Sequence, residues 1–146
     1  MSGSKDTDEV RRLLLKHVPE VKNGTVEIMG IARDPGRLSL IAVLAIDPAV
    51  DAIGACTGSR GSVIKPVVHS LPGDQLRIVR WSESPRDFIV NLMSPRKVKK
   101  VTFDDASRQA TIIASKYTQP APRLERDLDL KLASEMSGWD LRLVED

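Results

Sequence analysis

The sequence predicts an α+β protein that consists of two copies of one small unit. The first observation is an internal match: SLPGDQLRIV (residues 70–79) aligns with EMSGWDLRLV (residues 135–144) at a constant offset of 65. Self-similarity at a fixed spacing indicates a repeated structural unit. The second observation is that two strand-forming runs joined by a turn precede each copy. Strand, strand, helical region and strand therefore follow one another twice along the chain.

The first unit is expected to begin with a helix and a hairpin. Residues up to about Thr7 are small and polar and read as a frayed tail. Up to Pro19, which ends the helix, apolar residues follow at helical spacing: Val10, Leu13, Leu14 and Val18. Two β-rich runs, residues 25–32 and 38–46, then flank an Asp-Pro-Gly sequence that is typical of a turn. We expect these two runs to pair as a hairpin.

Two short helices and a strand are expected to complete the first unit. Asp47 and Pro48 supply an N-cap and a first-turn proline for a helix through about Ala55. After a glycine-rich loop, apolar residues recur at helical spacing over residues 63–71, and QLRIVRW (residues 75–81) reads as a strand. Pro66 lies in the second of these helices, where it costs about one backbone hydrogen bond unless it falls in the first turn.

The second unit repeats the hairpin but differs in its helical region. Residues 83–96 have a helical middle bracketed by Ser-Pro at each end, which favours a short connecting helix over a flexible linker. Residues 100–115 (KVTFDDASRQATIIAS) repeat the hairpin. The following stretch, residues 121–136, favours one amphipathic helix with apolar side chains at steps of four: Leu124, Leu128, Leu132 and Met136.

The composition fits a folded domain with an uneven charge distribution. The chain has 146 residues, of which 41% are apolar, enough for one ordinary domain or two very small ones. Residues 51–100 carry nine basic and four acidic side chains, whereas residues 101–146 carry six and nine. The middle is thus +5 and the last third −3. A basic middle is compatible with a polyanionic partner, and a solvated charged surface without a partner explains it equally well.

Metal, disulfide and membrane chemistry are not expected. The chain has one cysteine, Cys56, and two distant histidines, His17 and His69, so it has neither an internal disulfide nor a zinc-binding spacing. No apolar run approaches the roughly 18 residues of a membrane span, and the N-terminus lacks the apolar stretch of a secretion signal. We therefore expect a cytoplasmic chain without a metal or other cofactor.

The stretch IGACTGSRGSVIK (residues 53–65) raises the possibility of a phosphate-binding loop. A P-loop fails, because Ser59 stands where the second glycine would follow Gly54. A dinucleotide fingerprint also fails, because the glycines join two predicted helices and do not follow a strand. Cys56 with His69 as a base would be a candidate nucleophile, but a single cysteine on an apolar helix is more often buried. No constellation of residues favours an enzyme.

A Gly-x-x-Gly loop between two short helices matches a different chemistry. Gly58 and Gly61 enclose Ser59 and Arg60, with a hairpin before and a strand after. Such a loop clamps the sugar-phosphate backbone of a short single strand. Glycine lets the main chain approach a phosphate where a Cβ atom would intrude, and the amides at the start of the next helix would face the negative charge. The pattern therefore predicts a single-stranded RNA partner.

Several stretches together resemble the tandem KH domains of the NusA family of bacterial transcription elongation and termination factors. They are VPEVKNGTVEIMGIARDPG, DPAVDAIGACTGSRGSVI, IVRWSESP and SGWDLRL, in the expected order from about Val10 to the C-terminus. The resemblance implies two tandem type II KH domains, each with helices on one face of a three-stranded sheet. It implies a tail and leading helix (1–18), a first KH domain (19–82), a linker helix (83–96) and a second KH domain (97–146). It leaves open whether the chain is a stand-alone relative or a fragment.

The second unit departs from the family pattern. Its Gly-x-x-Gly loop should occupy about residues 124–127, which read Leu-Glu-Arg-Asp, and residues 74–137 contain no glycine. Three carboxylates would add negative charge near the expected phosphate position: Glu125, Asp127 and Asp129. Binding of RNA by the side chains of Arg123, Arg126 and Lys131 is the weaker alternative. We hypothesise that this degenerate second unit is structural or binds protein.

The resemblance assigns the candidate RNA-binding residues to the first unit. Gly58, Ser59, Arg60 and Gly61 would grip the RNA backbone, with the amide and hydroxyl of Ser62 nearby. Arg60 and Lys65 would add salt-dependent phosphate attraction. The groove floor would be aliphatic, from residues such as Ile53, Val63 and Ile64, and the strand around Arg77 to Val79 would read base edges.

Two questions of partner stay open at this point. The main hypothesis is a NusA-like RNA-binding protein in transcription elongation, termination or antitermination. The alternative is a KH-fold adaptor that acts mainly through protein contacts, with RNA polymerase or ribosome-associated proteins. The basic run SPRKVKK (residues 94–100) is either a solvated edge or a second RNA surface, and Trp81 and Trp139 are expected to pack in the core or between the units.

Overall fold

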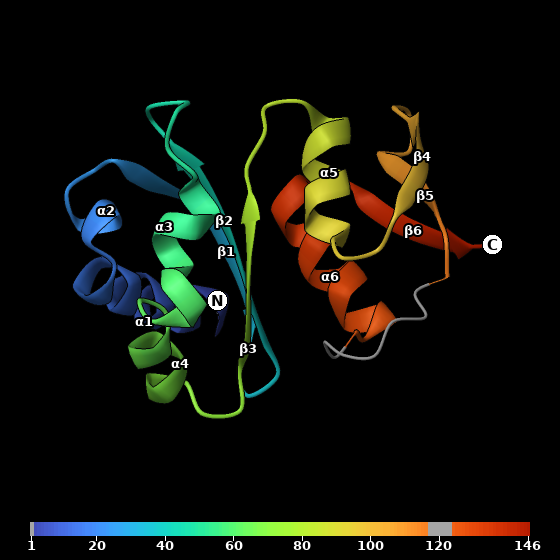
Figure 1. Cartoon of the computed structure of the whole chain (residues 1–146). Coiled ribbons are helices and arrows are strands. Elements are labelled where there is room, and N and C mark those ends of the chain that lie inside the picture. Colours follow the sequence, from blue (N-terminus) through green and yellow to red (C-terminus); the bar gives the residue numbers. More distant parts are fainter. Residues whose placement is uncertain (1, 117–123) are drawn as a thin grey trace. The chain divides into compact units, whose positions relative to one another are not determined.

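The chain forms two compact units, residues 1–81 and 82–146 (Figure 1). A computed structural model describes the backbone of residues 2–116 and 124–146, with side chains from Asp6 onward. Each unit contains one three-stranded mixed sheet. The predicted α+β class with two three-stranded sheets is therefore confirmed.

The first unit has the predicted order helix, strand, strand, helix, helix, strand, with a one-turn helix, α2, added after α1. Its elements are α1 (Ser2–His17), α2 (Pro19–Lys22), β1 (Val26–Asp34), β2 (Leu38–Ala45), α3 (Ala52–Thr57), the 3₁₀ turn η1 (Ser59–Gly61), α4 (Lys65–Ser70) and β3 (Gln75–Arg80). The sheet order is β1-β2-β3, with β1 antiparallel and β3 parallel to the central strand. β3 is consequently an edge strand.

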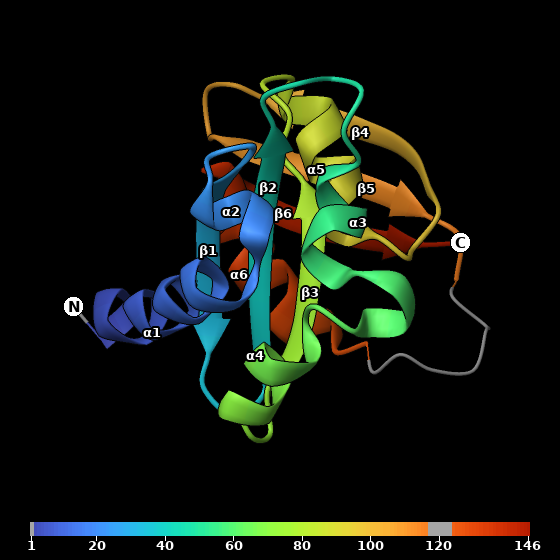
Figure 2. The ribbon, with the colours of Figure 1, turned by 60° about the vertical axis from the view of Figure 1, so that its left-hand side comes forward.

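The helices of the first unit share one apolar core with one face of its sheet. Val10 and Leu14 of α1 pack in the same buried cluster as Ile41 of β2, Cys56 of α3 and Val67 of α4. Figure 2 shows these helices over the sheet. Burying side chains of this size stabilises the fold by about 1.5–3 kcal/mol each. This core holds α3 and α4, and so both ends of the glycine-rich loop, in place.

The second unit repeats the sheet with a simpler helical layer. Its elements are α5 (Pro85–Met93), β4 (Val98–Asp104), β5 (Gln109–Ala114), α6 (Arg126–Ser137) and β6 (Asp140–Glu145). The order is again antiparallel, then parallel: β4-β5-β6. Where the first unit has α3, a loop and α4, the described part of the second has α6. Leu128 and Leu132 of α6 are buried and Met136 is half-buried as predicted, whereas Leu124 precedes the helix.

Two expectations need correction. The polar N-terminal residues continue α1 back to Ser2, so they are not a frayed tail. The N-cap of α3 is Asp51, whose side chain accepts the Gly54 N–H, whereas Asp47 forms a tight turn by accepting the Ala49 N–H at 2.9 Å. The stretch 83–96, predicted as a linker helix, contains α5, which packs against α6 of the second unit.

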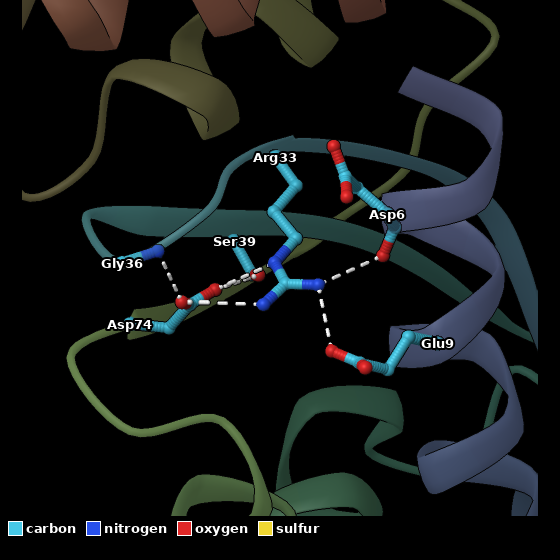
Figure 3. Close-up of polar contacts among 6 residues, drawn as sticks. All are labelled: Asp6, Glu9, Arg33, Gly36, Ser39 and Asp74. Carbon is cyan, nitrogen blue, oxygen red and sulfur yellow. Dashed lines mark hydrogen bonds and ion pairs between the residues drawn. The ribbon is translucent and has the colours of Figure 1, made fainter. Parts of the chain in front are cut away.

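A buried ion pair connects α1 with β1 and with the segment that precedes β3 (Figure 3). Arg33 of β1 donates through Nε to Asp74 at 2.9 Å and through Nη1 to Glu9 at 2.9 Å. Asp74 also accepts from Ser39 Oγ and from the Gly36 N–H, both at 2.7 Å. The Asp74 side chain has no exposed surface. The network joins α1, the β1–β2 turn and the segment between α4 and β3.

The surroundings of Asp74 favour its charged form. Burial by itself would raise the pKa of this carboxyl group. Hydrogen bonds from Arg33, Ser39 and Gly36, together with the charge of Arg33, act in the opposite direction and hold the pKa of Asp74 below its ordinary value. The carboxylate is therefore ionised in the folded protein at neutral pH.

Candidate nucleic-acid interface

The glycine-rich loop begins where α3 ends. Asp51 caps the first turn of this helix through a hydrogen bond of 3.1 Å from the Gly54 N–H to its Oδ1. A Cβ atom on Gly54 would lie 2.5 Å from Asp51 Oδ2, so a side chain there would displace the capping carboxylate. Gly58 terminates the helix with a φ of 74°, and its N–H donates to the Gly54 carbonyl at 2.8 Å. The chain then turns sharply away from the helix axis.

Gly58 and Gly61 are required for different physical reasons. A Cβ atom on Gly58 would lie 2.5 Å from Val63 Cγ2 and 2.8 Å from the Val63 nitrogen, so no side chain fits. A Cβ atom on Gly61 would have Ile64 Cγ2 as its nearest neighbour, at 3.8 Å, so there is space. The Gly61 φ of 73° is nevertheless in the left-handed region that favours glycine. Gly61 therefore presents a bare main chain to the exterior.

The loop satisfies most of its own backbone groups. The N–H groups of Val63 and Ile64 both donate to the Thr57 carbonyl, at 3.0 and 3.2 Å, and the Ser62 N–H donates to the Ser59 carbonyl at 3.0 Å. The amides that lead into α4 are thus engaged within the loop, contrary to the expectation that they face a phosphate. The Ser62 amide is therefore not available for the phosphate contact that was predicted for it. The Ser62 residue itself is exposed.

The two amides between the glycines are different. Within residues 2–116 and 124–146, no acceptor is found for the N–H groups of Ser59 and Arg60. Arg60 has a left-handed φ of 55°, which is uncommon for a residue with a side chain. Successive N–H groups in right- and left-handed turn conformations form an anion-binding concavity. The loop can therefore offer two main-chain donors to one phosphate.

The predicted site residues divide into an exposed and a half-buried group. Ser59, Arg60, Ser62 and Lys65 are exposed around the loop. Ile53, Val63 and Ile64 are half-buried and pack against the core of the first unit, as an aliphatic floor requires. Pro66 lies in the first turn of α4, where its missing N–H disrupts no helical hydrogen bond.

The edge of β3 is a candidate for the second side of the interface. Gln75 and Trp81 donate their N–H groups to carbonyls of the β1–β2 turn and of β2, at 3.0 and 2.8 Å. Because hydrogen-bonding residues alternate in a parallel ladder, Leu76 and Ile78 direct their N–H and C=O groups away from β2. α3 lies against this strand (Figure 2). The main chain of Ile78 is therefore a candidate base-edge reader that the sequence did not single out.

Arg77 does not join the loop residues. Leu76 and Ile78 pack on the core beneath the helices, so alternation along β3 turns the Arg77 side chain to the opposite face of the sheet. The structure thus places α3, which carries Ile53 and leads into the loop, against β3, and alternation puts the Arg77 side chain on the other face of the sheet. A period of two in the strand was the signal that distinguishes Arg77 from Ile78.

Cys56 has the environment of a core residue. Its side chain is 1% exposed in α3. Burial, with a smaller contribution from the charge of Glu20, raises the pKa of the Cys56 thiol to about 11. The thiol is consequently protonated at neutral pH and is not an activated nucleophile. Among the described residues, no group of three or more His, Cys, Asp or Glu side chains is placed to hold a metal ion, and no helix is long and apolar enough to cross a membrane.

The second unit has no comparable loop where one is described. Glu125 and Arg126 lead directly into α6, and Arg123 lies outside the described residues. Glu125 and Asp127 are exposed, but Asp129 is buried and forms an ion pair with Arg96 at 2.8 Å. The expectation that Asp129 adds charge at the phosphate position is therefore wrong. Its role is to fasten α6 to the segment that follows α5.

The basic run and the second tryptophan have structural partners. Lys99 pairs with Asp146 at 2.8 Å, and Arg96 is buried as described above. Trp139 is 7% exposed, with the Phe103 ring edge-on at 4.8 Å and the Arg108 guanidinium 4.4 Å from its ring centre. The expected packing role of Trp139 agrees with these contacts.

The profile of the NusA-like first KH domain matches residues 4–81 of the chain. This match covers more than half of the sequence and includes the whole Gly-x-x-Gly loop. The chain belongs to the NusA-like KH family. The predicted family is therefore confirmed, and the Gly58–Gly61 loop is the Gly-x-x-Gly loop of its NusA-like KH domain.

Relatives of known name agree with this assignment. The chain is 37% identical over 132 residues to the transcription termination/antitermination protein NusA of Halalkalibacterium halodurans, covering 90% of the chain and 35% of that protein. It is 36% identical over 136 residues to NusA of Thermus thermophilus, covering 93% of the chain and 35% of that protein. The chain thus spans about a third of the length of these NusA-like relatives. The crystal structure of APE1850 has the same fold, with a TM-score of 0.56, 16% identity, and coverage of 90% of this chain and 96% of that one.

Proposed function

We propose that this NusA-like KH protein binds single-stranded RNA through its first unit. The observation that carries the proposal is the pair of unengaged amides, Ser59 and Arg60, held between two glycines at the end of α3. They provide donors for a phosphate, and Arg60 and Lys65 provide exposed positive charge beside them. KH loops of this kind clamp about four backbone nucleotides.

The bases would lie between α3 and the edge of β3. Ile53, Val63 and Ile64 offer aliphatic surface to their faces, and the Ile78 main chain offers one donor and one acceptor to a base edge. No aromatic side chain occurs in the loop or on β3. Recognition therefore rests on hydrogen bonds and aliphatic contact, without the aromatic stacking that RRM sheets use.

The biological setting of the proposal follows from the relatives, which are named transcription termination/antitermination proteins. We infer that the chain acts on nascent RNA in transcription elongation, termination or antitermination, in the cytoplasm and in contact with RNA polymerase. Non-enzymatic action is part of the same proposal.

A titration of short single-stranded RNA tests this function. The unmodified chain and a Gly58→Asp/Gly61→Asp variant are compared at two salt concentrations, with circular dichroism as the control for folding. The proposal predicts binding by the unmodified chain that weakens with salt and is lost in the folded variant. Equal binding by both proteins would eliminate the clamp.

One observation favours the adaptor alternative. A hollow of about 220 Å³ lies between α1 and β1, lined by apolar residues that include Leu15, Val21 and Ile28 and by the charged Arg11 and Glu27. Leu15 is 43% exposed. Exposed apolar surface with a polar rim is typical of protein contact sites. If Leu15→Ser weakened binding to RNA polymerase or ribosomes while RNA binding stayed intact, protein contact would be a separate function of this unit.

A further inference from the structure

The edge strand of the second unit has the same backbone geometry as β3. Asp140 and Asp146 donate their N–H groups to the carbonyls of Arg108 and Ala114, at 2.9 and 3.1 Å. Alternation in the parallel ladder then directs the backbone groups of Leu141 and Leu143 away from β5. At the sequence offset of 65, Leu143 aligns with Ile78, the candidate base-edge reader of the first unit.

Side chains of α6 bond to two of these outward groups. Ser134 Oγ accepts the Leu141 N–H at 3.1 Å. At the other end, the Arg126 guanidinium donates through Nη2 to the Leu143 carbonyl and through Nη1 to Glu145 at 3.4 Å. The Leu141 N–H and the Leu143 carbonyl, two of the outward groups of this edge, are thus satisfied within the chain.

The first unit lacks these contacts at the equivalent positions. At the sequence offset of 65, Arg126 aligns with Gly61, which has no side chain. Ser134 aligns with His69, which is exposed on α4. In the part of the chain that the structure describes, no side chain donates to the Ile78 carbonyl. Two differences, arginine for glycine and serine for histidine, therefore separate the more accessible edge of β3 from the partly occupied edge of β6.

We propose that the second unit closes its own nucleotide groove, with Arg126 on the Leu143 carbonyl in the place where an RNA base would bind. This inference rests on the proposed function, because the first unit defines which edge reads the base. Ser134 closes the other end of the same edge. RNA bound by the chain then contacts the first unit alone, and Arg126 limits the length of RNA that is held.

Amide NMR of the full chain, titrated with single-stranded tetranucleotide RNAs of mixed sequence, tests the proposal. Four proteins are compared: the unmodified chain, Arg126→Ala, Arg126→Lys and Lys131→Ala. Lys131→Ala is the matched control, because it removes one exposed positive charge from α6 away from the edge. Arg126→Lys retains a donor for the Leu143 carbonyl. Dispersed amide signals of β5 and β6 show whether each variant folds.

The expected result is that RNA shifts the amides of Leu143 and Glu145 in Arg126→Ala and leaves them unchanged in the other three proteins. Shifts at these amides in the unmodified chain would overturn the proposal, and this reading holds even if Arg126→Ala fails to fold. Absence of RNA-induced shifts at the Leu143 and Glu145 amides in folded Arg126→Ala would also overturn the proposal, because closure would then not depend on Arg126. The amides of Ser59, Arg60 and Ile78 report separately on the first unit, so a failure of the proposed function is distinguished from a failure of this inference.

Discussion

At the scale of single residues, the Gly58–Gly61 loop shows how two glycines can serve one site for different reasons. Gly58 is excluded from carrying a side chain by contact with Val63, whereas Gly61 is constrained by its left-handed φ and faces open space. A substitution at Gly58 must rearrange the loop. A substitution at Gly61 adds a side chain to the surface at the cost of local strain, which makes Gly61 the cleaner position for a functional test.

Arg60 and Lys65 are predicted to set the salt dependence of RNA binding. Both side chains are exposed beside the loop, and each phosphate contact on single-stranded nucleic acid contributes a slope of about 0.7 in log K against log salt. Arg60→Ala and Lys65→Ala should each reduce the slope by about that amount. Titrations at four salt concentrations measure it, and Lys22→Ala, far along the chain in α2, is the control. An unchanged slope in both variants would remove these side chains from the interface.

Cys56 is predicted to resist alkylation in the folded protein. Its thiol is buried and its pKa is raised to about 11, so very little thiolate exists at neutral pH. Iodoacetamide should therefore modify the native chain far more slowly than the chain in denaturant, with mass spectrometry as the readout. Rapid modification of the native protein would contradict the packing of α3 described above.

At the scale of elements, Asp74 holds together segments that are distant in sequence. The carboxylate is fully buried and bonds to Arg33, Ser39 and the Gly36 amide, so it connects the strand hairpin with the approach to β3. Without Asp74 the buried Arg33 keeps only the partly exposed Glu9 as a carboxylate partner, and removing one partner of a buried ion pair costs about 3–5 kcal/mol. Asp74→Ala should lower the free energy of unfolding by about that amount. Denaturant unfolding measures this change. The control is Asp34→Ala, which removes a partly exposed carboxylate at the β1–β2 turn.

The lowered pKa of Asp74 predicts that the folded protein loses stability in acid. The pKa of Asp74 is lower in the folded state than in the unfolded chain, so its contribution to stability is fully present above the ordinary aspartate pKa of about 4. That contribution is lost as the pH falls through the lower, folded-state pKa. Midpoints of urea unfolding measured from pH 6 down to pH 2 should decrease more steeply for the unmodified chain than for Asp74→Ala. Parallel pH profiles would refute this assignment.

The elements themselves were largely predictable from local patterns. Both hairpins and the helix of residues 126–137 follow from strand-forming runs, turn residues and apolar spacing. The start of α3 was placed four residues early because Asp47 and Asp51 are both suitable caps by residue type, and only tertiary structure selects between them. The position of α5 in the second unit also depends on packing against α6, which no local pattern contains.

At the scale of the whole molecule, the repeat explains which part of the site the sequence could predict. Comparison of the two copies showed that one loop keeps its glycines and the other lacks them. The sequence did not single out the Ile78 main chain, because the pairing of β3 with β2 decides which backbone groups of β3 face outward. It also placed Asp129 at the surface, since a carboxylate on a helix is usually solvated, whereas the buried Arg96 draws it inward.

The most direct test of the account compares two substitutions at Gly61 in a titration of single-stranded RNA. Gly61→Asp and Gly61→Asn impose similar backbone strain, and asparagine tolerates the left-handed conformation well. They differ in a negative charge placed where the phosphate would bind. The account predicts that Gly61→Asp loses at least about tenfold in affinity relative to Gly61→Asn, or about 1.4 kcal/mol. Equal affinities for the two folded variants would contradict a phosphate clamp at Gly58–Gly61.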